Sequence, residues 1–383
     1  MADRLFPIGS EWRKWDLHIH SPASLVHQYP GPDPWERFLE GLATLPPEIS
    51  VIGINDYLFM DGYRRVRQEF ESGRFPNLLA VMPVVELRID QLVGTEGHLN
   101  KINFHVVFDP SVGADSIEAQ FINGLSADYR LDPSRVDVSW SGFPSRENLA
   151  GLGAAIRATI PGAQKNRYTE NDTMLGFNNL VLTLDQVRQR LKQPVFDDQC
   201  ITAVGKTEWD SLHWNDHSIA RKKDVINGAD AVFIAAESSS AYERARRKLV
   251  DADVNARLLD CSDAHSLKDG SSKDRLGNAF TWINADPTLP GLVHALTEFE
   301  ERVFVGDRPP KLAAVSKRPS DHVRSIRIQK QAAATAPHEY FDLSLDLNPG
   351  SWPLLATRVR ARVHCSTCSG WPATVRTSRT SPS

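Results

Sequence analysis

Two histidines, His18 and His20, stand one residue apart at the end of the hydrophobic run Trp15–His20. In a strand, side chains two residues apart point to the same side, so both imidazoles can face one point. Imidazole is a common ligand of zinc, manganese and iron. The turn-forming segment Ser21–Ser24 follows at once, and active sites of parallel barrels lie where strands open into loops. The spacing therefore indicates a metal site, although two polar residues on an exposed edge strand would give the same pattern.

Further possible ligands lie within, at the end of or just after other hydrophobic runs. They are Asp56, Glu86, His105, Glu237, Asp263 and His265. Burying several ionisable groups is costly unless they are paired or bind a metal, so the set favours a shared metal centre. Taken alone, His105 would more often be a hydrogen-bonded core histidine, and Glu237 could simply pair with a nearby cation. His213, in an expected loop, is a further candidate ligand, and an exposed loop histidine is the equally good alternative.

Strands and helices alternate over residues 14–305. The expected strands are Trp15–His20, Val51–Asp56, Leu78–Leu87, Ile102–Phe108, Ile201–Lys206, Ala231–Ala235, Arg257–Cys261 and Phe280–Ile283. The expected helices between them are Pro34–Leu45, Tyr63–Glu71, Ser218–Asn227, Ser240–Ala252 and Leu289–Glu301. Hydrophobic strands that alternate with helices indicate a parallel α/β sheet, and seven or eight repeats favour a closed barrel.

Residues 110–195 interrupt this alternation. The segment is polar and rich in Ser, Gly and Asn, with expected helices at Asp115–Leu125, Asn148–Ile160 and Thr183–Leu191. It is too long for an ordinary connection, so we expect an inserted helical domain. The insertion could cap the open face of the barrel, or it could lie remote from the site.

The composition is that of a soluble globular protein, with 383 residues, 41% hydrophobic and 24% charged. No apolar run reaches membrane-spanning length, no secretory signal is present, and four cysteines are too few for a disulfide framework. We therefore expect a cytoplasmic protein without membrane contact. Residues 351–383 carry five Arg and no Asp, Glu or Lys, so the net charge of −4 becomes −9 for residues 1–350. This excess of acidic residues is expected of a chain that binds metal ions through carboxylates.

The motifs Asp-Leu-His-Ile-His, Gly-Ile-Asn-Asp-Tyr, Val-Glu, Asn-Phe-His and Ser-Asp-Ala-His resemble those of the PHP (polymerase and histidinol phosphatase) domain family. The resemblance covers residues 10–310. It implies a distorted (β/α)7 TIM-like barrel that holds two or three divalent metal ions (Mn, Zn or Fe) and hydrolyses phosphoesters. Carried over residue by residue, the ligands would be His18, His20, Glu86, His105, Asp263 and His265, with Asp56 a further one. Tyr57 stands where the family has a histidine ligand, which leaves the third metal position open.

This ligand set predicts a phosphoester hydrolase of phosphatase or nuclease type that uses a metal-activated hydroxide. Asp263 or His265 could also serve as the base that orients the nucleophile. Lys206 and Arg275 are candidate cations for the substrate phosphate, and ordinary surface salt bridges are their alternative role. The substrate would be a phosphorylated small molecule or a nucleic acid.

The sequences of Gly205–Asp210 and Gly277–Ile283 most resemble those of the TrlF-like group. In that group an ATPase domain follows the PHP domain in the same chain. We expect a linker at residues 311–337 and the first strand of such an ATPase at residues 338–350, with period-two alternation in Phe341–Leu347. No phosphate-binding loop follows.

The composition changes abruptly after Gly350. Read in another frame, codons for Ala356–Val363 permit Gly-Asn-Lys-Gly-Ser-Gly-Lys-Ser, which has the pattern of a phosphate-binding loop. We therefore predict a shift of reading frame near Gly350 and a disordered tail at residues 351–383. In that tail, His364, Cys365 and Cys368 would bind no metal. Resequencing the DNA tests this, and codons that cannot yield the loop contradict it.

Two other functions remain open. An amidohydrolase also has paired histidines on its first strand, but Glu86 and the late Asp263–His265 pair fit it less well. A non-catalytic module that senses a metal or nucleotide would explain Tyr57. A truncated chain could also be a folded remnant without activity.

Overall fold

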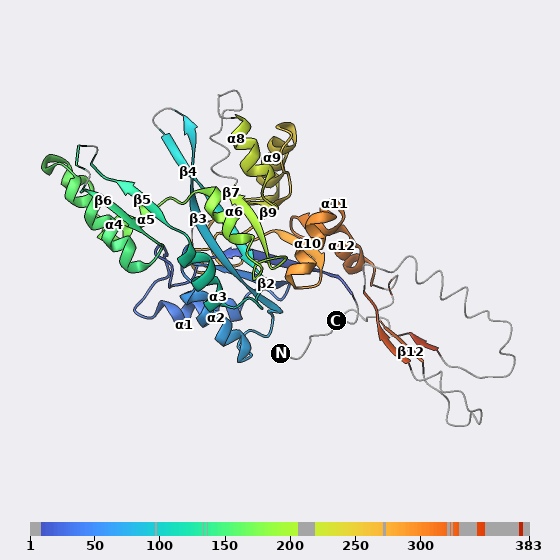
Figure 1. Cartoon of the computed structure of the whole chain (residues 1–383). Helices are drawn as coiled ribbons and strands as arrows, with labels where there is room; N and C mark the ends of the chain where they lie inside the picture. The colour runs from blue at the N-terminus through green and yellow to red at the C-terminus, as the bar shows by residue number, and fades with distance from the viewer. Residues whose placement is uncertain are drawn as a thin grey trace. The chain divides into compact units, whose positions relative to one another are not determined.

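The computed structural model describes residues 9–95, 98–132, 134–135, 137–205, 219–270, 273–319, 322, 325–328, 343–348 and 375–377. The chain divides into two compact units, and Figure 1 traces the elements of both. The large unit comprises residues 14–281 with 287–289, and the small unit comprises residues 1–13, 282–286 and 290–383. No helix within the described residues has the length and apolar character needed to cross a membrane.

A mixed sheet forms the centre of the large unit. The strands of this nine-stranded sheet that belong to the large unit are, in spatial order, β1 (Glu11–Ile19), β2 (Ile49–Asn55), β3 (Ala80–Thr95), β4 (His98–Phe108), β7 (Cys200–Gly205), β8 (Ala231–Ile234) and β9 (Leu258–Asp260). Each contains or overlaps a strand expected from the sequence. Every residue of β2 is buried, which fits a strand covered on both faces.

The expectation of a wholly parallel sheet is wrong at β4. This strand runs antiparallel to both β3 and β7, whereas β1–β2, β2–β3, β7–β8 and β8–β9 are parallel pairs. Only two residues separate the end of β3 from the start of β4, and so short a connection can join only antiparallel strands.

The sheet is nearly closed and barrel-like, because the chain that leaves β9 returns to β1. Ile19 and Ala264 form a parallel β-bridge. The His20 N–H donates to the Ala264 carbonyl at 3.0 Å, and the Ala264 N–H donates to the His18 carbonyl at 3.3 Å. The Ser262 N–H donates to a buried carboxylate oxygen of Asp16, on β1, at 2.9 Å. These bonds place the end of β1 beside the loop after β9.

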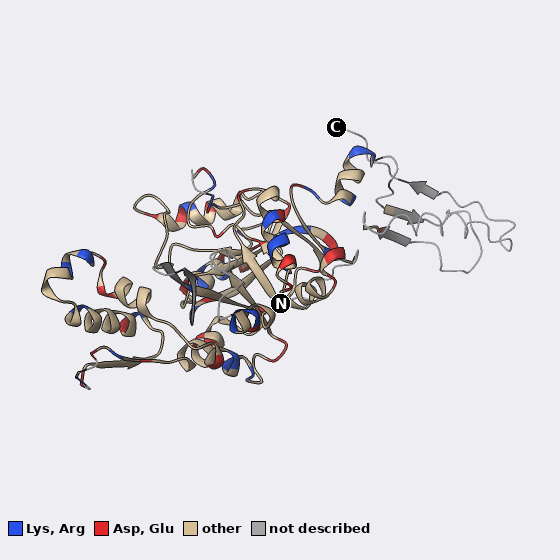
Figure 2. Ribbon diagram, turned by 90° about the horizontal axis from the view of Figure 1, so that it is seen from above, with Lys and Arg blue, Asp and Glu red and all other residues tan. Residues whose placement is uncertain are grey.

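Helices connect the parallel strands of this sheet. They are α1 (Pro34–Ala43), α2 (Asp61–Glu71), α8 (Ile219–Asn227) and α9 (Ser239–Asp251), all close to their expected positions. Asp33 caps α1 and Ser238 caps α9, each accepting a backbone N–H of the first turn. Tyr242 of α9 donates its hydroxyl proton to the Leu258 carbonyl at 2.8 Å, which attaches this helix to β9. Acidic and basic residues share the same helices (Figure 2), as in the Arg67–Glu71 pair of α2.

The insertion at residues 110–195 is mostly helical, as expected. It contains α3 (Ala114–Ser116), η1 (Ile117–Phe121), η2 (Ile122–Gly124), α4 (Arg146–Thr159), η3 (Gly162–Arg167), α5 (Asp172–Asn179) and α6 (Leu184–Leu191). The antiparallel pair β5 (Ala127–Arg130) and β6 (Ser139–Gly142) was not expected. Helices α4 and α5 approach so closely that a Cβ at Gly153 would lie 1.8 Å from the Asp172 carbonyl oxygen. Glycine at this position therefore permits the contact.

The small unit contains most of β10 (Thr281–Ala285) and α10 (Leu289–Thr297) and all of α11 (Phe299–Arg302), β11 (Val303–Val305) and α12 (Pro310–Lys317). It also has a three-stranded antiparallel sheet in the order β13 (Leu343–Asp346), β12 (Ser325–Ile328) and β14 (Val375–Thr377). The segment predicted as a linker, residues 311–337, therefore carries most of α12 and all of β12. The predicted strand at Phe341–Leu347 contains β13. In the predicted tail, residues 375–377 form β14, and residues 351–374 and 378–383 lie outside the described residues.

Candidate metal centre

Five of the predicted ligands come together at one end of the sheet. His18 is near the end of β1, Glu86 is on β3 and His105 is on β4. His20 follows β1 and Asp263 follows β9, and the bridge between these two segments brings them side by side. The side chains form two groups that are close enough to hold a metal ion, one of His18, His20 and Asp263 and the other of His18, Glu86 and His105.

The first group has the spacing of three ligands around one ion. His18 Nε2 lies 3.1 Å from His20 Nε2 and 3.2 Å from Asp263 Oδ1, and His20 Nε2 lies 3.3 Å from the same oxygen. Ligands held at ~2.1 Å from a metal are about 3.0 Å apart in an octahedral site and about 3.4 Å apart in a tetrahedral one. The donor set of two imidazoles and a carboxylate suits zinc, manganese or iron.

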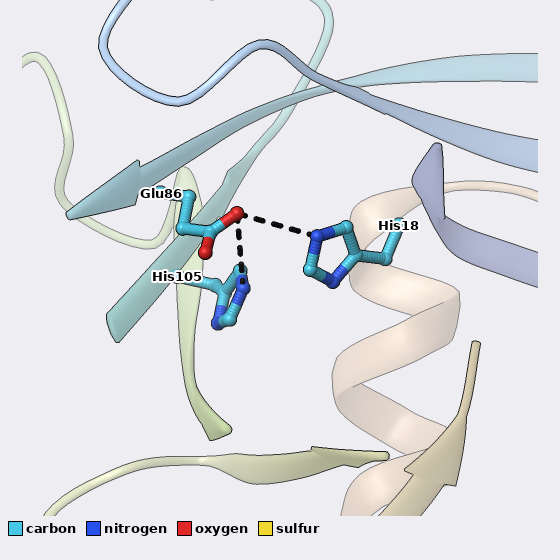
Figure 3. A group of neighbouring side chains, drawn as sticks. All are labelled: His18, Glu86 and His105. Atoms are coloured by element: carbon cyan, nitrogen blue, oxygen red, sulfur yellow. Dashed lines mark ion pairs between the residues drawn. The ribbon is translucent and has the colours of Figure 1, made fainter. Parts of the chain in front are cut away.

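The second group is built by the antiparallel pairing of β3 with β4, in which Glu86 and His105 are direct partners. Figure 3 shows the Glu86 carboxylate between the two imidazoles, with Oε2 at 3.3 Å from His18 Nε2 and at 3.7 Å from His105 Nε2. Both ring nitrogens of His105 are buried and make no hydrogen bond. A buried polar atom without a partner is costly, and a metal ion at this position would satisfy one of the two nitrogens.

His18 belongs to both groups, but its Nε2 has one lone pair and can bind one ion. Glu86 has two carboxylate oxygens, and its Oε2 also lies 3.7 Å from His20 Nε2. A carboxylate in this position could serve two neighbouring ions at once. The residues therefore provide three ligands for one ion, and they can hold a second ion if the Glu86 carboxylate binds both ions.

Burial and mutual attraction set the protonation states of these groups. Burial lowers the pKa of His18, but the Asp263 and Glu86 carboxylates outweigh burial and raise it to about 9. Burial dominates at His20 and lowers its pKa to about 4. Burial raises the pKa of Asp263, but His18 and His20 outweigh this effect and hold it at about 2. Glu86 likewise has a pKa well below its ordinary value, because His105 and His18 outweigh burial.

Hydrogen bonds from neighbouring residues orient the ligands. Asn55, at the end of β2, donates its amide N–H to Glu86 Oε2 at 2.7 Å and accepts the Tyr57 N–H at 3.1 Å. Ser24 Oγ lies 3.3 Å from His20 Nδ1, which leaves Nε2 of that ring directed at the other ligands. Such outer contacts fix the ring and carboxylate orientations of metal ligands. Neither Asn55 nor Ser24 was a candidate from the sequence.

Two residues beside the ligands adopt left-handed backbone conformations. Asp263 has φ 49° and Tyr57 has φ 57°. Aspartate tolerates this region, but a bulky aromatic residue rarely does, so the surrounding contacts must hold Tyr57 in place. Its ring lies 4.7 Å from that of His20 and 4.8 Å from that of Phe177, a residue of the insertion. The insertion therefore contacts the residues around the site, as the capping interpretation requires.

The remaining candidates have other positions. His265 stacks on His20 at 4.0 Å, and its Nδ1 lies 2.8 Å from the Asp263 carbonyl, but it is in neither group. Both carboxylate oxygens of Asp56 accept hydrogen bonds from Ser21, from N–H at 2.8 Å and from Oγ at 2.7 Å. Glu237 is exposed, and neither it nor Asp56 belongs to the groups found among the described residues.

Of the three remaining candidates, Lys206, His213 and Arg275, the structure describes only Arg275. Arg275 is half-buried and forms a β-bridge with Ser266. Lys206 and His213 lie outside the described residues.

A cavity of about 210 Å³ adjoins the two groups. Its lining includes His18, His105 and Asp263 together with Lys273 and Asn103. Lys273 was not a candidate from the sequence, and it lies ten residues beyond Asp263 in a polar loop. Asn103 could have been found from its spacing, because it is two residues from His105 on the same strand.

Neither comparison with known proteins assigns this chain to a family. A scan against models of protein families gave no match, and a search of curated proteins found none similar to it.

Proposed function

We propose that this chain is a metal-dependent phosphoester hydrolase, of phosphatase or nuclease type, with the PHP fold. The observation that carries the proposal is the convergence of His18, His20, Glu86, His105 and Asp263 on one end of a barrel-like sheet, next to a cavity. These residues come from four strands or strand ends that are up to 245 positions apart in the sequence. Their motifs are also the ones that resemble the PHP family.

The chemistry of the donor set supports two divalent ions, chosen among manganese, zinc and iron, with His18, His20 and Asp263 holding one and Glu86 and His105 contributing to the other. Bound ions of this kind lower the pKa of water and offset charge on phosphoryl oxygens. His20 has a depressed pKa and is neutral near pH 7, as a ligand must be. His265 stacks on His20 at 4.0 Å, and its Nδ1 lies against the Asp263 carbonyl, which can only accept a hydrogen bond, so the proton-accepting nitrogen of the neutral ring is Nε2. That nitrogen could accept or deliver a proton during hydrolysis.

The test is hydrolysis by the purified protein supplied with manganese. We expect turnover of p-nitrophenyl phosphate, of bis-p-nitrophenyl phosphate or of RNA, and a loss of at least about a hundredfold in the Asp263→Asn variant. His294→Ala is the matched control, because His294 is an exposed histidine on α10. Metal bound without hydrolysis of any phosphoester would contradict the proposal and favour a non-catalytic sensing module. Hydrolysis of amides alone would favour an amidohydrolase.

A further inference from the structure

The cavity beside the metal-binding groups carries one basic side chain that the preceding chemistry leaves without a role. Lys273 is the one lysine or arginine among the described residues that line it. Its neighbours around the cavity include His18, His105 and Asp263 from the two groups, together with Phe233. A cation thus shares this space with the groups that would bind metal.

The backbone holds Lys273 at this position. The loop that follows Asp263 folds back, so that residues 273–276 run beside residues 264–266. His265 N–H donates to the Asp274 carbonyl at 3.0 Å, Ser266 Oγ donates to the same oxygen at 2.9 Å, and Leu276 N–H donates to the Ser266 carbonyl at 3.0 Å. Lys273 is therefore attached to the same structure that places Asp263 and His265.

Among the described residues, the ammonium group has one weak hydrogen bond and a charge interaction with its neighbour Asp274. Lys273 is exposed, and its Nζ lies 3.4 Å from the carbonyl oxygen of Ala235, another residue of the cavity wall. A hydrogen bond of this length is near the limit of the interaction. Two of the three N–H groups of an ammonium could turn to a ligand without breaking a strong bond.

We propose, on the basis of the proposed function, that Lys273 binds the phosphoryl group of the substrate and that this substrate is a small phosphomonoester. A phosphomonoester has three non-bridging oxygens and two negative charges, whereas a diester has two such oxygens and one charge. With two oxygens facing the metal-binding groups, a monoester has a third left for Lys273, and a diester has none. Charge-assisted hydrogen bonds of ammonium to phosphate are among the stronger polar contacts in proteins.

The size of the cavity agrees with a small substrate. A volume of about 210 Å³ is below the ~300–1,000 Å³ of pockets that enclose drug-sized ligands. Phe233 gives this space an apolar wall, on which a small carbon group could pack beside the phosphate. A nucleic acid strand would have to extend out of the cavity on both sides of the reacting phosphate.

The first experiment measures binding of inorganic phosphate to the manganese-loaded protein by calorimetry, with metal content checked by mass spectrometry. We expect Lys273→Ala to bind phosphate about ten- to a hundredfold more weakly than the wild type, with an unchanged number of ions per chain. Lys268→Ala is the matched control, because Lys268 is an exposed lysine of the same loop that does not line the described cavity. Equal phosphate affinity in the wild type and Lys273→Ala, or equal weakening by Lys268→Ala, overturns the assignment.

The second experiment compares the two synthetic substrates. We expect Lys273→Ala to raise KM for p-nitrophenyl phosphate by about the same factor and to leave KM for bis-p-nitrophenyl phosphate within about twofold. A rise in KM for both substrates, or turnover of RNA and the diester alone, contradicts the monoester. A wild-type chain that binds manganese but neither phosphate nor monoester contradicts this inference but is consistent with the metal centre. A chain that binds no metal defeats the proposed function as well.

Discussion

Binding of a metal ion by His18, His20 and Asp263 should release one proton near pH 7, because His18 is the one of these three that carries a proton in the metal-free protein. Its pKa of about 9 exceeds pH 7 by about two, so the protonated form dominates by about a hundredfold. His20, Asp263 and Glu86 have depressed pKa values and have already lost their protons. The apparent affinity should therefore rise about tenfold for each pH unit between 7 and about 8.5, and level off above pH 9.

The assay is calorimetric titration with manganese or zinc in two buffers of different ionisation enthalpy, which counts the protons released. The His18→Ala variant removes the protonated ligand and should release none. An affinity that is flat from pH 7 to 8.5 in the wild type, or release of no proton, would refute the assignment of His18 as a charged residue between two carboxylates.

The same residue makes the stability of the metal-free protein depend on pH. The pKa of His18 in the folded chain, about 9, lies above its ordinary value of 6.5. The protonated ring therefore stabilises the fold fully below pH 6.5, and this stabilisation is lost as the pH rises to about 9. At 1.36 kcal/mol per pKa unit the loss is about 3 kcal/mol. Urea unfolding of the metal-free protein at several pH values measures it, and stability that increased over this range would contradict the account.

Two substitutions test the residues around the ligands. Asn55→Leu removes the amide that donates to Glu86, so we expect metal affinity to fall about ten- to a hundredfold in competition with a chelator, and an unchanged affinity would contradict this orienting role. Asp56→Ala leaves the N–H and hydroxyl of Ser21 without their partner, so we expect about 2–4 kcal/mol less stability in urea unfolding and an unchanged number of bound ions. Loss of an ion in Asp56→Ala would instead identify Asp56 as a ligand.

The hydrophobic runs were sufficient to predict where strands occur, because a buried strand needs apolar residues whatever its direction. They could not predict that β4 is antiparallel. The direction follows from the hairpin that joins β3 to β4, and the polar residues of that hairpin, such as Asp90 and Lys101, obscured the two strands beyond Leu87 and before Ile102. The β5–β6 pair was missed because four-residue strands give too short a pattern.

The candidate ligands were predictable since imidazoles and carboxylates are rarely placed within or just after buried strands without a partner. The residues that orient them were not. Asn55 reaches Glu86 only because of the register between β2 and β3, in which Asn55 pairs with Val84. Lys273 reaches the cavity only because its loop folds back onto residues 264–266. Contacts of this kind depend on tertiary structure, and local sequence patterns do not specify them.

The most direct test of the metal centre is the number of metal ions per chain, measured by mass spectrometry on the purified protein after removal of free metal. The account predicts two ions in the wild type and fewer than one in a His18→Ala, Asp263→Ala double variant that keeps its fold by circular dichroism. Equal metal content in the two proteins, or none in either, would contradict it.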